Sequence, residues 1–160
     1  MPTPPARLWL LGCLLWLSSL TTLAAGDVLH IATRPGVQHS LLWWPAPAAR
    51  ATVLLFPGGN GGFGRVTDGV PDGDNFLVRA APLLVAQGLN VAIFGRPDDG
   101  SGLGYEARID APHLADIGAV LAEVRRRAGQ TPWLVGTSRG TLSATAAAIA
   151  LQTQVAGLIL

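Results

Sequence analysis

The sequence has 160 residues, 49% of them hydrophobic, and its 11 basic and 10 acidic residues leave a net charge of only +1. This balance argues against a surface that binds nucleic acid or an anionic membrane, because both need clustered positive charge. The only cysteine is Cys13, so no internal disulfide can form. No run of residues has the spacing of metal ligands, and we expect neither a metal site nor thiol chemistry.

The first 25 residues have the order of a secretory signal peptide. Arg7 precedes an almost wholly apolar run from Leu8 to Leu23, and small residues follow at Ala24 and Ala25. The run is short for a helix that spans a membrane. We therefore expect residues 1–25 to be removed and the protein to be exported, to the periplasm or the medium. A retained N-terminal anchor and a lipoprotein modified at Cys13 remain as alternatives.

Three β-rich runs open the predicted domain, which spans residues 26–160. Val28 to Thr33 and Val37 to Trp44 flank the turn signal Arg34-Pro35-Gly36, which predicts a hairpin. Ala51 to Phe56 is apolar throughout, as is typical of a strand covered by helices on both faces.

Helices and strands alternate along the rest of the chain. In order, we predict a helix from Phe76 to about Gln87, a strand Asn90 to Phe94, a helix from Asp110 to about Ala128, a strand Thr131 to Thr137, a helix from Arg139 to about Thr153, and a strand from Val155. Pro82 predicts a kink in the first of these helices or a later start. The alternation predicts an α/β fold of three layers, a mostly parallel sheet with helices on both faces. Because Leu160 lies within an apolar strand that needs a further covering helix, we expect the domain to be incomplete at its C-terminus.

The segment Gly136-Thr137-Ser138-Arg139-Gly140 matches the pattern G-x-S-x-G at the junction of a predicted strand and an alanine-rich helix. A serine at such a junction adopts a strained backbone that projects its hydroxyl from the end of the sheet. The residues two before and two after then approach too closely for side chains, which explains Gly136 and Gly140. The N–H of Arg139, at the helix N-terminus, can stabilise an oxyanion. The pattern predicts Ser138 as a catalytic nucleophile.

A glycine-rich loop, Gly58 to Gly64, follows the buried strand that ends at Phe56. Its bare backbone N–H groups can point at a carbonyl oxygen, so we predict Gly59, and next to it Asn60, as the second oxyanion donor. The same loop satisfies G-x-G-x-x-G, which leaves a dinucleotide-binding domain as a remote alternative. That fingerprint needs a helix to open within the motif, and the loop segment Asp68 to Gly73 intervenes here.

The order of elements, the glycine loop and the serine junction resemble the α/β-hydrolase family, in particular its serine esterases and lipases, over the whole predicted mature chain. The resemblance implies hydrolysis of a carboxylic ester, or less readily an amide, in a small-molecule substrate without metal or organic cofactor. It also implies a triad in the chain order Ser, acid, His. Pro57 departs from the family, in which a histidine often opens the glycine loop.

No Asp, Glu or His follows Ser138, so the acid and the histidine that the resemblance implies are not in this chain. We expect little or no activity from the chain as it stands. His113 is the best upstream histidine, but we expect it to bond nearby loops at a helix start. Asp98 and Asp99 follow a predicted strand, where exposed turn aspartates are the simpler interpretation. The main alternative function is a non-catalytic, hydrolase-like binding domain, and the sequence does not indicate the substrate or the oligomeric state.

Overall fold

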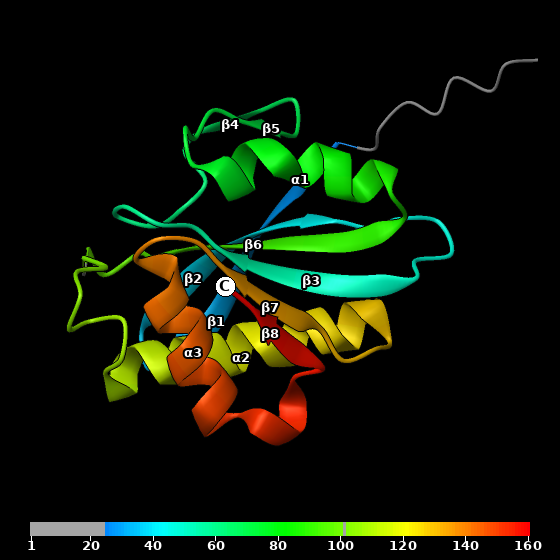
Figure 1. Cartoon of the computed structure of the whole chain (residues 1–160). Coiled ribbons are helices and arrows are strands. Elements are labelled where there is room, and N and C mark those ends of the chain that lie inside the picture. The colour runs from blue at the N-terminus through cyan, green and yellow to red at the C-terminus, as the bar shows by residue number, and fades with distance from the viewer. Residues whose placement is uncertain (1–24, 101) are drawn as a thin grey trace, which may run out of the picture.

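The computed structural model describes residues 25–100 and 102–160, and it arranges them as a layered α/β fold (Figure 1). The strands are β1 (Asp27–Arg34), β2 (Val37–Trp44), β3 (Ala51–Phe56), β4 (Val66–Thr67), β5 (Val70–Pro71), β6 (Leu89–Pro97), β7 (Trp133–Gly136) and β8 (Gly157–Ile159). The helices are α1 (Phe76–Ala86), α2 (Ala111–Ala128), α3 (Gly140–Ala150) and the short 3₁₀ turn η1 (Gln152–Gln154). The predicted signal peptide lies outside the described residues, apart from Ala25, and remains a prediction.

The main sheet has six strands in the order β1-β2-β6-β3-β7-β8. β1 and β2 form the predicted hairpin, and β2 pairs with β6 in antiparallel fashion. β6, β3, β7 and β8 are all parallel to one another. The structure therefore confirms the prediction of a mixed, mostly parallel sheet in an α/β fold.

Helix α1 covers one face of the sheet, and α2 and α3 cover the other (Figure 1). Alternation along β2 shows how both faces become apolar: Leu41 and Trp43 enter the core beneath α2 and α3, whereas Leu42 and Trp44 enter the core beneath α1. All four side chains are at most 4% exposed. Full burial of such a side chain contributes on the order of 1.5–3 kcal/mol, so these two cores hold the layers together.

The helix ends follow the chemistry of the sequence. The Asn75 side chain caps α1 by accepting from the N–H of Leu77 at 2.9 Å, and Asp110 caps α2 in the same way through the N–H of His113. Helix α2 ends at Gly129, which has a φ of +65°. Pro82 lies inside α1 without delaying its start at Phe76. Among the described residues, no helix has both the length and the apolar character needed to cross a membrane.

Two details differ from the sequence-based prediction. The glycine- and aspartate-rich stretch contains the small hairpin of β4 and β5, whose turn residues Asp68 and Gly69 both have positive φ. Strands of two residues are too short to give a hydrophobic period, although Asp-Gly is a known hairpin signal. Helix α3 stops at Ala150 and tightens into η1, so the predicted helix end at Thr153 was late.

Candidate active site

The loops that carry the predicted site lie at one edge of the sheet, where the parallel strands end and the helices begin (Figure 1). The glycine loop follows β3, residues 98–110 follow β6, and Ser138 follows β7. In an open α/β sheet this edge is where ligands bind, because loops of neighbouring strands converge there. The topology thus places the serine and the glycine loop side by side.

Ser138 has the backbone conformation that a nucleophile elbow requires. Its φ is +50°, in the left-handed region, and its side chain is exposed. This conformation costs roughly 1–2 kcal/mol for a residue with a Cβ. The strain is held by two hydrogen bonds to the Ser138 carbonyl oxygen, from the N–H of Thr141 at 3.0 Å and from its hydroxyl at 2.6 Å. The serine is consequently fixed at the tip of the turn.

The two elbow glycines are required by close backbone packing. A Cβ on Gly140 would lie 1.9 Å from the carbonyl oxygen of Phe56, and a Cβ on Gly136 would lie 2.8 Å from the Cα of Thr141. Real side chains do not approach that closely, so only glycine lets α3 begin directly against β3. Gly58 is under the same constraint, because a Cβ there would lie 2.8 Å from the Cβ of Ser138.

The glycine loop borders the serine through Gly58 and then turns outward. Gly59 has a φ of +60°, and both Gly59 and Asn60 are exposed. Within the described part of the chain, no hydrogen bond uses the backbone N–H of Gly59, Asn60 or Arg139. The Arg139 N–H directly follows Ser138 in the chain, and Gly59 and Asn60 directly follow Gly58, the loop residue that packs against Ser138.

The same loop does not have the geometry of a dinucleotide site. Gly64 is followed by the β4–β5 hairpin, and α1 begins only at Phe76. No helix N-terminus therefore opens within Gly59 to Gly64 to meet a pyrophosphate, as the fingerprint requires.

Arg108 was not singled out from the sequence, yet it is the residue that braces this loop. It is only 1% exposed, and its guanidinium donates to the carbonyl oxygens of Pro57 at 3.3 Å and Gly59 at 3.1 Å. It also donates to the Leu103 carbonyl oxygen and the Ser143 hydroxyl. Burial, and next the charges of Arg139 and Arg96, lower the pKa of Arg108, but a guanidinium stays protonated in proteins. No local sequence pattern marks an arginine as buried, since the loop that surrounds it is irregular.

Asn75, which caps α1, also contacts the elbow. Its side-chain oxygen also lies 3.5 Å from the hydroxyl of Thr137, the residue before the serine. The start of α1 is thereby tied to the elbow.

His113 forms its side-chain hydrogen bond with Ser143 and not with Ser138. Its Nε2 is 2.9 Å from the Ser143 hydroxyl, and the ring is 4% exposed. Arg108 donates to the same hydroxyl, so the Ser143 Oγ links the His113 ring to the buried guanidinium. Burial is the main cause that lowers the pKa of His113 to about 4. The contacts match the expectation of a helix-start residue that bonds its surroundings.

His39 is fully buried on β2 and packs on Phe94 with ring centroids 4.0 Å apart. Its Nδ1 lies 3.0 Å from the Ser40 carbonyl oxygen, whereas its Nε2 has no partner among the described residues. Burial is again the main cause that lowers its pKa to about 4. Two neutral histidines thus lie inside the fold.

These histidines predict that the protein loses stability in mild acid. The unfolded chain binds protons at each histidine below a pKa of about 6.5, whereas the folded chain binds them only below about 4. Stability is therefore full above pH 6.5 and falls as the pH drops through this window, by roughly 2–3 kcal/mol per histidine at pH 4.5. Urea unfolding at about pH 7.5 and 4.5 should show the loss.

His39→Phe should remove about half of this acid dependence, because the aromatic contact is kept and the titrating group is gone. His30→Gln, at an exposed position of β1, is the matched control and should keep the wild-type dependence. The hydrogen bond from Arg126 lowers the pKa of Glu123 to about 2. The contribution of Glu123 to stability is therefore lost only below pH 4.5, outside the range of this comparison. An equal loss in His39→Phe and wild type would contradict the assignment.

Asp98 and Asp99 have structural contacts at the edge of the sheet. The Asp98 carboxylate accepts from the backbone N–H of Gln38 at 2.9 Å. Asp99 forms an ion pair with Arg34 at 2.9 Å, and Arg34 also pairs with the buried Asp116 at 2.7 Å. These bonds tie the loop after β6 and helix α2 to the β1–β2 hairpin. They support the interpretation of Asp98 and Asp99 as structural turn residues.

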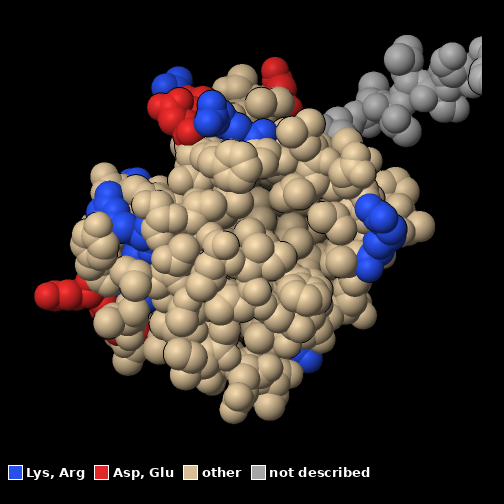
Figure 2. Space-filling view, in the orientation of Figure 1, with Lys and Arg blue, Asp and Glu red and all other residues tan. Residues whose placement is uncertain are grey.

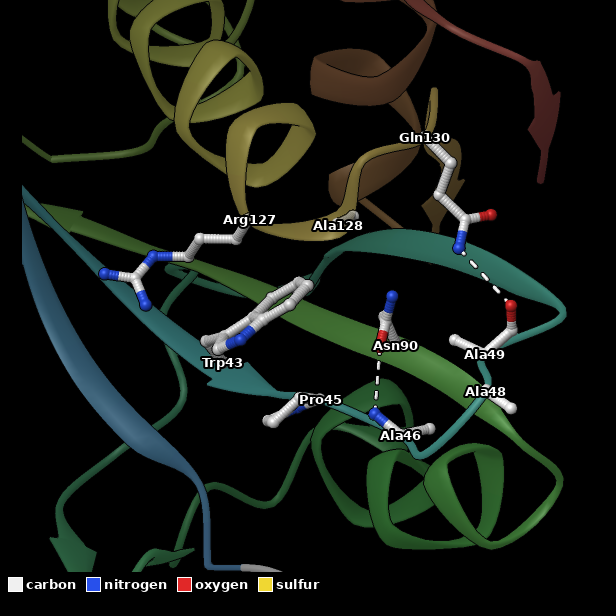
Figure 3. A pocket seen from close by; sticks show the side chains of 9 residues that line it. All are labelled: Trp43, Pro45, Ala46, Ala48, Ala49, Asn90, Arg127, Ala128 and Gln130. Carbon is white, nitrogen blue, oxygen red and sulfur yellow. Dashed lines mark hydrogen bonds between the residues drawn. The ribbon is translucent and has the colours of Figure 1, made fainter.

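The hollow shown in Figure 3 lies at the opposite edge of the sheet from Ser138. It encloses about 430 Å³ and is lined by Trp43, Pro45, Ala46, Ala48, Ala49, Asn90, Arg127, Ala128 and Gln130. Its polar side chains are engaged with the chain itself: Asn90 accepts from the N–H of Ala46 at 2.8 Å, and Gln130 donates to the Ala49 carbonyl oxygen. No serine, threonine or cysteine lines this hollow, and the predicted nucleophile Ser138 lies at the other edge.

Comparison with solved structures decides the fold. An esterase of Pyrococcus furiosus matches with a TM-score of 0.62 and 16% identity, over 82% of this chain and 49% of that protein. The α/β-hydrolase fold is shown by this match. A serine hydrolase without a lid from Xanthomonas campestris matches with a TM-score of 0.54 and 23% identity, over 80% of this chain and 57% of its own length.

An alpha-beta serine hydrolase homologue from Coxiella burnetii matches this α/β-hydrolase fold with a TM-score of 0.55 and 24% identity, over 84% of the chain and 61% of that protein. The chain thus spans between about half and three-fifths of the length of these structures. No protein-family model matches the sequence, and no curated protein matches it. At such identities the shared property is the fold, and the reaction must be argued from the site.

Proposed function

We propose that this protein is a serine hydrolase that cleaves a carboxylic ester, with Ser138 as its nucleophile. The observation that carries the proposal is the elbow: an exposed serine with a φ of +50°, held between a strand end and a helix start. Ala48 and Asp68 have similar φ values, but they lie outside strand-to-helix junctions, whereas Ser138 combines the strain with an exposed hydroxyl between β7 and α3. Such strain clusters at functional sites. The unpaired N–H groups of Arg139 and Gly59 on either side support the same reaction.

In the proposed reaction the Oγ of Ser138 attacks the acyl carbon and gives its proton to a base. The carbonyl oxygen becomes an oxyanion, which the N–H groups of Arg139 and Gly59 stabilise, with Asn60 beside them. The intermediate collapses, the bond between the acyl carbon and the alcohol oxygen breaks, and the alcohol leaves with the proton from the base. Water then repeats these steps on the acyl-serine and releases the carboxylic acid and free Ser138.

The base and its orienting acid are proposed to come from sequence beyond Leu160. No Asp, Glu or His follows Ser138 in this sequence, and the upstream candidate His113 is bonded to Ser143. The matched structures are also longer than this chain. We therefore expect the downstream reading frame to encode an Asp or Glu after a later strand and a His after the last one. Finding neither would favour the alternative function, a non-catalytic binding domain.

Two variants of the nucleophile test the proposal in the protein expressed from its full reading frame. Ser138→Ala and Ser138→Gly should both lower the turnover of 4-nitrophenyl esters by roughly 10⁴-fold or more, since the covalent intermediate cannot form. Ser138→Gly should in addition be more stable than Ser138→Ala by about 1 kcal/mol, because glycine adopts positive φ without strain.

Thermal or denaturant unfolding of the two variants measures that difference. Ester hydrolysis that survives in both variants would contradict the assignment of the nucleophile. Equal stability of the two variants would contradict the strain at the elbow.

A further inference from the structure

Three arginine side chains surround the glycine loop. Arg96 donates to the Gly61 carbonyl oxygen through Nε at 3.2 Å and Nη2 at 3.0 Å, and Arg108 holds the loop from within the protein. Arg139 reaches across from the elbow, and its Nη2 lies 3.4 Å from the Asn60 side-chain oxygen. Three positive charges therefore lie around one short loop that borders the nucleophile.

None of these three arginines has a carboxylate partner among the described residues. The ion pairs there involve Arg34, Arg65, Arg126 and Arg127 instead. Asp98 and Asp99, on the nearby loop, are bonded to Gln38 and Arg34. Glu106 is exposed and forms no ion pair with any of the three.

The pKa of Arg108 is consistent with this lack of carboxylate partners. Besides burial, the groups that lower its pKa are Arg139 and Arg96, and no carboxylate acts in the opposite direction. The space-filling view shows blue atoms on the left-hand edge of the molecule, with red atoms just below them, and this is the edge at which the glycine loop and the loop after β6 lie (Figure 2). Positive charge therefore gathers at the glycine loop itself, although acidic side chains lie on the neighbouring loop and the whole chain is almost neutral.

Arg139 is the arginine best placed to meet a substrate. It directly follows Ser138, it is partly exposed, and its guanidinium lies over the Tyr105 ring at 5.5 Å from the ring centroid. The contact fixes the direction of a long side chain, so that less freedom is lost when it binds a ligand. Its bond to Asn60 uses one of five N–H donors and is long, which leaves a planar fork for a carboxylate.

We infer that the substrate of this site is an ester that carries a negative charge, a carboxylate a few bonds from the scissile carbonyl, and that Arg139 pairs with it. The inference rests on the proposed serine hydrolase function and names its substrate class. Arg96 and Arg108 add to the potential that attracts the anion, while the guanidinium of Arg139 supplies the hydrogen bonds that orient it.

A matched pair of esters tests the inference in the protein expressed from its full reading frame. Mono-4-nitrophenyl adipate and 4-nitrophenyl hexanoate have acyl chains of equal length and differ in a terminal carboxylate against a methyl group. The wild type should prefer the adipate half-ester in kcat/KM by roughly tenfold, as a hydrogen-bonded charge pair provides. High salt should reduce that preference.

Arg139→Gln should bring the ratio of the two kcat/KM values close to one, and Arg139→Lys, which keeps the charge, should retain part of the preference. A wild type that prefers the hexanoate, or a ratio that Arg139→Gln leaves unchanged, overturns the inference while the proposed function stands. No enzymatic hydrolysis of either ester, together with no labelling of Ser138 by a fluorophosphonate, contradicts the proposed function and this inference with it.

Discussion

Gly140→Ala is expected to lower the free energy of unfolding by roughly 3 kcal/mol or more, which is large for a single methyl group. The added Cβ would lie 1.9 Å from the Phe56 carbonyl oxygen and 3.0 Å from the Pro57 carbonyl carbon, and both are backbone atoms. No rotamer change relieves such a contact, so α3 must move away from β3. The elbow would move with it, and turnover should fall together with stability.

Gly118→Ala is the matched control, since Gly118 also lies in a helix on the same face of the sheet. The atom nearest to a Cβ added at Gly118 belongs to the Leu151 side chain and lies 3.9 Å away, so α2 has room for a methyl group. Alanine in a helix interior should raise stability by about 0.5–1 kcal/mol. Denaturant unfolding measures the free energy of unfolding of both variants. Similar effects of the two substitutions would contradict the close packing of α3 against β3.

Arg108→Met is expected to lower the kcat of ester hydrolysis by roughly 10²-fold, with a smaller change in KM. The substitution leaves the Pro57 and Gly59 carbonyl oxygens without their donor, so the loop that carries the proposed oxyanion donor Gly59 is no longer held in place. Because oxyanion stabilisation acts in the transition state, the loss should appear in kcat. Stability should fall as well, by roughly 2–3 kcal/mol, since buried acceptors lose their partner.

The kinetics must be measured well below the melting temperature of the variant, so that unfolding does not mimic the loss. Arg126→Met provides the control, because Arg126 is an exposed residue at the end of α2 and pairs only with Glu123. It should cost at most about 1 kcal/mol and leave kcat unchanged. A normal kcat in folded Arg108→Met would contradict the proposed role of Arg108 in positioning the glycine loop.

The layers of the fold were predictable because each long element carries its own signal. The apolar run of β3, the alternation in β2 and the capping residues Asn75 and Asp110 all act within a few residues of the chain. The small β4–β5 hairpin was missed, since its strands of two residues have no period. The early end of α3 was missed because the segment Leu151 to Gln154 offers no glycine or proline to end the helix.

The site was predictable in part, and the division has a physical cause. Gly136, Ser138 and Gly140 obey a local steric rule, so their spacing alone indicates the strained turn. Arg108 depends on tertiary contacts, because its four acceptor residues span positions 57 to 143. The charge environment of Arg139 likewise arises only when the loops after β3, β6 and β7 meet at one edge of the sheet.

The most direct test of the central claim is to identify which residue a fluorophosphonate modifies. The protein expressed from its full reading frame is labelled, digested and mapped by mass spectrometry, with Ser138→Ala treated in parallel. We predict a single modified peptide that contains Ser138, and no modification in the variant. Labelling at another serine, or a wild type that stays unlabelled, would contradict the assignment of Ser138 as the nucleophile.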